Sequence, residues 1–128
     1  MSIIQIFFFI AAILAGFLVV FQILLAIGLP FGKLAWGGEY NKLPKKLRIS
    51  SFISSLLLAY ALIILLESAD LINVIGNKTI VSISKWMFLI IFGLSTLGNI
   101  TSKSRKEKMV MTPIALFLVF AFLIAIIG

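Results

Sequence analysis

The order of hydrophobic and polar residues divides the chain into four long apolar segments separated by three short polar ones. The apolar segments cover about residues 3–29, 49–66, 80–100 and 109–127. A helix needs about 20 residues to cross the hydrocarbon of a bilayer, and each segment is close to that length. The strands of a transmembrane β-barrel alternate in polarity over about ten residues, and these runs do not alternate. The pattern therefore predicts one all-α membrane domain over residues 1–128, a bundle of four transmembrane helices.

Prolines and glycines mark the ends of these segments. Gly28 and Pro30 are predicted to close the first span, because proline cannot continue the helical hydrogen-bond ladder. Pro44 suits the first turn of the second helix, where its missing N–H is not needed. Pro113 is expected either to begin the regular part of the fourth helix or to kink its first turn. The N-terminus has no basic segment before its apolar run, so no cleaved signal peptide is expected.

The composition strengthens the membrane assignment and narrows the chemistry. Hydrophobic residues make up 62% of the chain and the mean hydropathy is +1.26, whereas a soluble domain is about 45–50% apolar. The chain has no Cys and no His. Disulfides, thiolate nucleophiles, imidazole bases and the commonest metal ligands are therefore excluded. We expect no catalytic residues, no cofactor and no metal site, and hence no enzyme.

The charged residues are few and strongly biased, with 11 Lys and Arg against 4 Asp and Glu. In a soluble protein a net charge of +7 would suggest nucleic acid, but these cations flank apolar segments in short loops. The positive-inside rule then predicts an N-out/C-out bundle in a bacterial inner membrane, with the first and third loops in the cytoplasm and no nucleic-acid partner. Anionic lipid headgroups are the expected neighbours of these loops. Nine of the eleven cations lie there: Lys33, Lys42, Lys45, Lys46, Arg48, Lys103, Arg105, Lys106 and Lys108.

Polar residues inside the spans indicate where the helices meet or where a solute could pass. In the second span, hydroxyl residues one turn apart favour close helix packing, with a polar conduit wall as the alternative. Gln22 is expected to hydrogen-bond a neighbouring helix, and the Tyr60 hydroxyl needs a partner. The hydroxyl residues of the second span that lie one turn apart are Ser50, Ser51, Ser54 and Ser55.

A second group of polar residues gathers where the second and third spans reach the first and third loops. Ser95, Asn99 and Ser102 share one helical face. One hypothesis is that this region forms an inward-facing pocket for an anionic headgroup or a small solute, with the Arg48 guanidinium as the anion-binding group. We favour the simpler interpretation, in which Arg48 pairs with Glu107 while Asn99 only holds helices together. The pocket candidates are Trp36, Gly37, Gly38, Arg48, Asn99, Ser102 and Glu107.

The middle loop is nearly neutral and offers a weaker candidate. Glu67 and Asp70 lie three residues apart, so they share a face at the outer mouth of the bundle. Two carboxylates could coordinate a cation, but we favour a helix end at the water boundary, with the acids paired to Lys78 or Lys85. Lys85 is expected to reach the interface beside its neighbouring tryptophan.

Two segments resemble a family of small, uncharacterised bacterial four-span membrane proteins. They are AWGG–x5–LPKKLRISS, residues 35–51, and GNITSKSRKEKMVMTP, residues 98–113. The resemblance brings no activity with it. The size is also similar to small multidrug-resistance transporters, but those carry a glutamate in the first span, and this first span has no charge. The family pattern implies importance for Trp36, Gly37, Gly38, Pro44, Arg48, Asn99, Ser102, Ser104 and Glu107.

Two functional hypotheses follow. In the first, the protein binds or moves a small solute or lipid headgroup through the pocket. In the second, it is an accessory subunit whose basic loops contact anionic lipid or a partner protein, and a homo-oligomer suits either because four short spans enclose little volume. The face formed by Ser95, Asn99 and Ser102 separates them. A cavity at that face favours the first hypothesis, and burial against the serines of the second span favours the second.

Overall fold

Four long helices make up most of the protein, and no strand is present. In the computed structural model, which describes residues 1–128, they are α1 (Ile3–Ala26), α2 (Lys45–Ser68), α3 (Lys78–Ile100) and α4 (Arg105–Ile127). Each has 23 or 24 residues and is apolar enough to cross a membrane. The prediction of an all-α four-helix membrane bundle is confirmed, and the chain is a multi-pass membrane protein.

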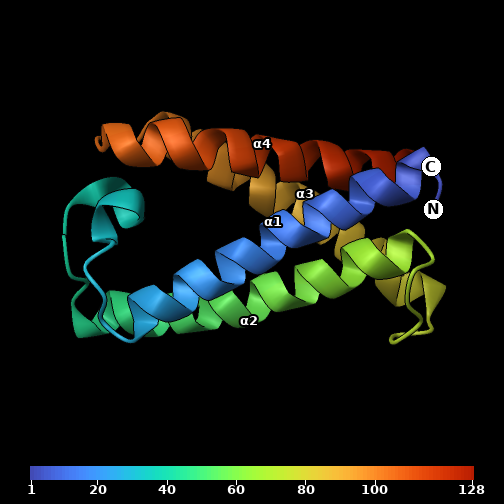
Figure 1. Ribbon diagram of the computed structural model, residues 1–128, viewed down its shortest axis with the longest axis horizontal. Helices are drawn as coiled ribbons and strands as arrows, with labels where there is room; N and C mark the ends of the chain where they lie inside the picture. Colours follow the sequence, from blue (N-terminus) through green and yellow to red (C-terminus); the bar gives the residue numbers. More distant parts are fainter.

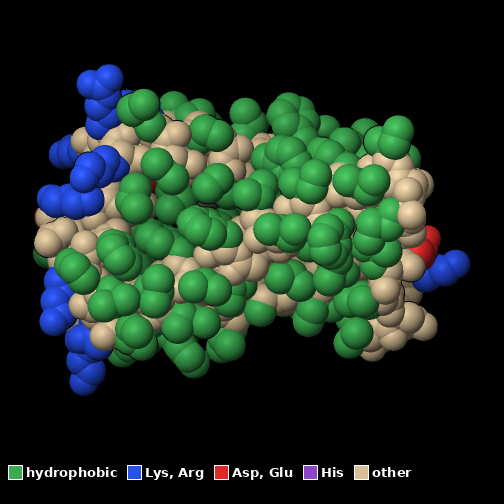
Figure 2. Space-filling model, viewed as in Figure 1, with side chains coloured by type: hydrophobic (Ala, Val, Ile, Leu, Met, Phe, Trp, Pro, Cys, Tyr) green, Lys and Arg blue, Asp and Glu red, His purple; other side chains and the backbone are tan.

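The helices pack as two antiparallel pairs, α1 along α2 and α3 along α4 (Figure 1). Both termini lie at one end of the bundle, which we call the terminal end. The α1–α2 and α3–α4 connections lie at the other end, and the Lys and Arg side chains gather there around an otherwise hydrophobic surface (Figure 2). We call this second end the basic end.

Three helix boundaries differ from the predicted spans. α1 ends at Ala26 instead of residue 29, whereas α2 begins at Lys45 instead of residue 49 and α4 at Arg105 instead of residue 109. Hydropathy detects only the part of a helix that suits hydrocarbon, so the polar first turns of α2 and α4 escape it. Pro44 lies at the N-cap, just before α2, and Pro113 lies well inside α4 instead of in its first turn.

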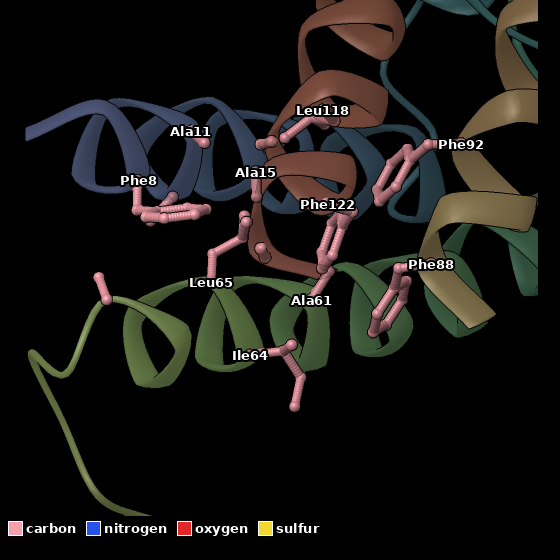
Figure 3. Close-up of a cluster of buried hydrophobic side chains, with 14 of the residues drawn as sticks. Phe8, Ala11, Ala15, Ala61, Ile64, Leu65, Phe88, Phe92, Leu118 and Phe122 are labelled. Carbon is pink, nitrogen blue, oxygen red and sulfur yellow. The ribbon is translucent and has the colours of Figure 1, made fainter. Parts of the chain in front are cut away.

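The core joins all four helices, and most of its residues are alanine or phenylalanine. Ala11 and Ala15 of α1 and Ala61 of α2 have no exposed surface, so the backbones of these two helices approach closely. Aromatic side chains of α3 and α4 fill the space opposite them (Figure 3). Lipid is as apolar as leucine, so packing contacts of this kind hold a membrane bundle together where hydrophobic burial cannot.

The loop between α2 and α3 is organised by Glu67. Its carboxylate accepts three backbone N–H groups, from Val74, Ile75 and Gly76, each at 2.9 Å. Both of its oxygens are therefore occupied, and the predicted pairing with Lys78 or Lys85 is wrong. The Lys85 ammonium instead donates to the Ala125 carbonyl at 3.1 Å, near the C-terminus of α4, where a cation complements the helix dipole. The Glu67 carboxylate thus serves the fold of this loop.

Candidate functional site

A cavity lies among the four helices in the half of the bundle nearest the basic end. Its volume is about 390 Å³, within the usual range for small-molecule sites. Thirteen of its nineteen lining residues are hydrophobic, so a mainly apolar molecule suits it. Its exposed lining residues on the helices, Leu57, Ser95 and Gly98, come from α2 and α3. The cavity therefore opens sideways between these two helices, toward the region that lipid occupies in a bilayer.

The paths of α2 and α3 create this space. The two helices are joined at the terminal end, and toward the basic end α3 leaves α2 to lie beside α4 (Figure 1). They meet where the Tyr60 hydroxyl and the Ser84 hydroxyl form a hydrogen bond of 2.5 Å. Phe88 and Phe92 form the inner wall, stacked on Phe122 with ring centroids 5.3 and 5.7 Å away (Figure 3). This aromatic packing closes the cavity toward the terminal end.

The loop between α1 and α2, residues 27–44, covers the cavity at the basic end, and we call it the basic-end loop. Trp36 lines the cavity, and its indole N–H donates to the Ser51 hydroxyl at 2.9 Å. Trp36, Gly37 and Gly38 have φ angles of 53°, 80° and 71°. Glycine adopts this left-handed conformation freely, but for tryptophan it costs about 1–2 kcal/mol. Non-glycine residues with strained backbone angles cluster at functional sites. Trp36 is such a residue, and it lines the cavity.

Glu107 is the only charged residue in the lining. It lies in the first turn of α4 and is only 6% exposed. Its Oε1 accepts the Gly37 N–H at 3.2 Å, and its own N–H donates to the Ser104 hydroxyl at 3.3 Å. The N-terminus of a helix stabilises a carboxylate. No Lys or Arg nitrogen lies within 4.0 Å of the Glu107 carboxylate oxygens, the distance limit of an ion pair. The predicted pairing of Glu107 with Arg48 is therefore wrong.

Arg48 and Ser102 were predicted in the pocket and lie elsewhere. The Arg48 Nε donates to the Ala26 carbonyl at 3.0 Å, so this side chain satisfies the end of α1, as basic residues commonly do. The Ser102 hydroxyl accepts the Ser104 N–H at 3.0 Å and shapes the turn between α3 and α4. Without Arg48 the cavity has no cationic side chain. An anionic headgroup, one of the two kinds of ligand considered from the sequence, therefore has no oppositely charged partner in the cavity.

The other predicted residues belong to the cavity or to its cover. Trp36, Asn99 and Glu107 line it. Gly37 and Gly38 lie in the basic-end loop, where Gly37 contacts Glu107 and Gly38 packs against the start of α4. The prediction that Ser95 and Asn99 share one face of α3 agrees with the structure, since both line the cavity. Ser102 does not share that face, because α3 ends at Ile100 and the i, i+4, i+7 geometry no longer holds beyond it.

Three polar lining residues were not among the candidates: Gln22, Ser54 and Ser95. The Gln22 Oε1 is buried without a hydrogen-bond partner. The sequence predicted a hydrogen bond from Gln22 to a neighbouring helix, and this oxygen does not form one. Ser51 and Ser55 are buried, as the packing interpretation of the serines predicted, whereas Ser54 faces the cavity. The two interpretations of the serines thus apply to different faces of α2, and a period of 3.6 residues could have separated them.

Comparisons with family models, curated proteins and solved structures give no match.

Proposed function

We propose that the protein binds a small, mainly apolar molecule that enters the cavity from the lipid between α2 and α3. The observation that carries the proposal is the space itself. Membrane bundles are held together by tight packing, and this one leaves about 390 Å³ unfilled among apolar side chains. Ser95 and Asn99 face that space and not the buried serines of α2, which favours binding or transport over a purely accessory role.

Two polar groups of the site, one of them charged, lie at one end of it. Asn99 and Glu107 lie near the basic end, whereas Phe88 and Phe92 form the inner wall. A ligand with a polar head and an apolar body matches this arrangement. The aromatic core closes the route to the terminal end, so the conformation described corresponds to a binding site open on one side. In a transporter it would be one state of an alternating cycle.

We also propose that the basic end faces the cytoplasm of a bacterial inner membrane, beside anionic lipid, with both termini outside. Nine of the eleven Lys and Arg residues of the chain lie at this end. The positive-inside rule, by which cations stay on the cytoplasmic side, therefore supports this orientation. The chain has no cysteine, so Lys45→Cys and Lys106→Cys introduce single labelling sites. A membrane-impermeant maleimide should label them only after the cytoplasmic face is exposed. Labelling of intact cells from the periplasm would contradict this orientation.

Fluorescence of Trp36 tests the binding proposal directly. The chain has two tryptophans, and Trp86 does not line the cavity. In a Trp86→Phe variant, a bromine-bearing aromatic compound should quench Trp36 with a saturable component on top of the linear quenching from lipid. The matched control is Trp36→Phe, in which Trp86 should show the linear component alone. Quenching of the same form in both variants would refute the proposal.

A further inference from the structure

The chemical class of the ligand follows from the groups that the cavity offers, and this inference rests on the proposed function. Eleven side chains of the protein are cationic, yet none lines the cavity, and the single charged group in its wall is the Glu107 carboxylate. The charge facing the ligand is thus opposite in sign to the net charge of the protein, +7. Bulk electrostatics would attract an anion to the basic end, whereas the cavity itself disfavours one.

The partners of Glu107 leave part of its charge without compensation. One backbone N–H and the start of α4 stabilise the carboxylate, but no cation contacts it. A buried charge normally pairs with an opposite one, because an isolated ion loses its hydration without replacement. A ligand cation in the adjoining cavity would supply that partner.

Gln22 is another polar residue of the wall. Its side-chain oxygen is covered by protein atoms and has no hydrogen-bond donor. The Glu107 carboxylate therefore remains the one anionic group that the wall offers to a ligand. A protonated amine can donate hydrogen bonds to this carboxylate, and a quaternary ammonium is attracted by its charge, whereas a carboxylate or phosphate is repelled.

We propose that the ligand is a lipophilic cation, an amine or quaternary ammonium carried on an apolar body. Its charged head lies beside Glu107 at the basic end of the cavity, and its body extends toward the rings of Phe88 and Phe92. Entry from the bilayer between α2 and α3 suits such amphipathic molecules, because they concentrate at the membrane interface before they reach the protein.

Three probes of nearly equal size separate charge from shape. They are (4-bromophenethyl)trimethylammonium, its neutral analogue with a tert-butyl group in place of trimethylammonium, and 3-(4-bromophenyl)propionate. Each probe is titrated against the Trp86→Phe protein in lipid nanodiscs. Affinities are calculated from the concentration of the probe in the membrane, so that differences in partitioning between water and lipid cancel. We expect the ammonium to bind about tenfold more tightly than the neutral analogue, as for a charge pair in a partly dry site. The carboxylate should bind more weakly than the neutral analogue.

Two variants test whether Glu107 causes the preference. Glu107→Gln keeps an oxygen for the Gly37 N–H and should reduce the ratio of ammonium to neutral affinity to about one. Asn99→Asp adds a second carboxylate to the lining and should raise the ratio, and it keeps the inference testable if the first variant unfolds. An unchanged ratio in a folded Glu107→Gln protein, or preference for the neutral or anionic probe in the parent, would overturn the inference and leave the binding site standing. Absence of saturable quenching by all three probes would refute the binding site as well.

Discussion

Substitution of Gly38 by alanine should destabilise the cover of the cavity far more than the same substitution at Gly37. Both glycines have left-handed φ angles, 71° and 80°, so alanine costs each about 1–2 kcal/mol of backbone strain. At Gly37 the added Cβ meets nothing within 4 Å. At Gly38 it would overlap the Ser104 Cβ and lie 2.8 Å from the Ser104 hydroxyl. Forced overpacking costs about a further 1–3 kcal/mol.

The difference between the two variants therefore isolates the contact between the basic-end loop and the start of α4. We expect the free energy of unfolding of Gly38→Ala to fall about 1–3 kcal/mol below that of Gly37→Ala, measured by denaturant titration in detergent micelles with circular dichroism. Saturable quenching of Trp36 should weaken in the same order, because the loop that carries Trp36 would move away from α4. Equal destabilisation by the two alanines would show that the loop does not pack against Ser104, and the description of the cavity cover would be wrong.

Three further substitutions test the packing around the site. Replacing Glu67 by Gln removes one of the acceptor oxygens that hold the middle loop, so its backbone amides should exchange with deuterium faster. Tyr60→Phe should lower stability by about 1 kcal/mol, typical of a hydrogen bond between transmembrane helices, and a double-mutant cycle with Ser84→Ala should show coupling. Phe122→Ala empties about 100 Å³ of the core, which at about 24 cal/mol per Å³ costs about 2 kcal/mol of unfolding free energy.

Each of these results has a clear opposite. Unchanged amide exchange in the Glu67 variant would mean that its three hydrogen bonds do not persist in the membrane. Additive effects of the Tyr60 and Ser84 substitutions would remove the contact at which α2 and α3 meet. An unaffected Phe122→Ala protein would mean that the inner wall of the cavity is not packed, and the cavity would then extend toward the terminal end.

The fold was predictable because hydrocarbon constrains it so strongly. Four apolar runs of sufficient length, separated by polar loops, leave a helical bundle as the remaining arrangement. The helix ends were predicted less well, since caps such as Pro44 and Ser104 act through local geometry that hydropathy does not register. Pro113 inside α4 was also missed, because proline in a transmembrane helix is tolerated where neighbouring groups adjust.

The site was predictable only in part, because its polar residues meet through tertiary packing. Asn99 and Glu107 were found as polar residues at one depth, and both line the cavity. Arg48 lies at a similar depth but turns to the end of α1, a choice that depends on where the basic-end loop runs. Depth alone does not fix the direction of a side chain. The charged residue in the lining is therefore Glu107, whereas the pocket hypothesis placed the Arg48 cation there as well.

Protection of a single cysteine tests the central claim that this cavity binds a ligand. Ser95→Cys places a thiol in the cavity, and Ser82→Cys, on an exposed face of the same helix outside the cavity, is its matched control. Both thiols are labelled in nanodiscs with N-ethylmaleimide, with and without saturating (4-bromophenethyl)trimethylammonium. The account predicts that the probe slows labelling of the thiol at position 95 and leaves the thiol at position 82 unaffected. Equal labelling rates with and without the probe at position 95 would contradict it.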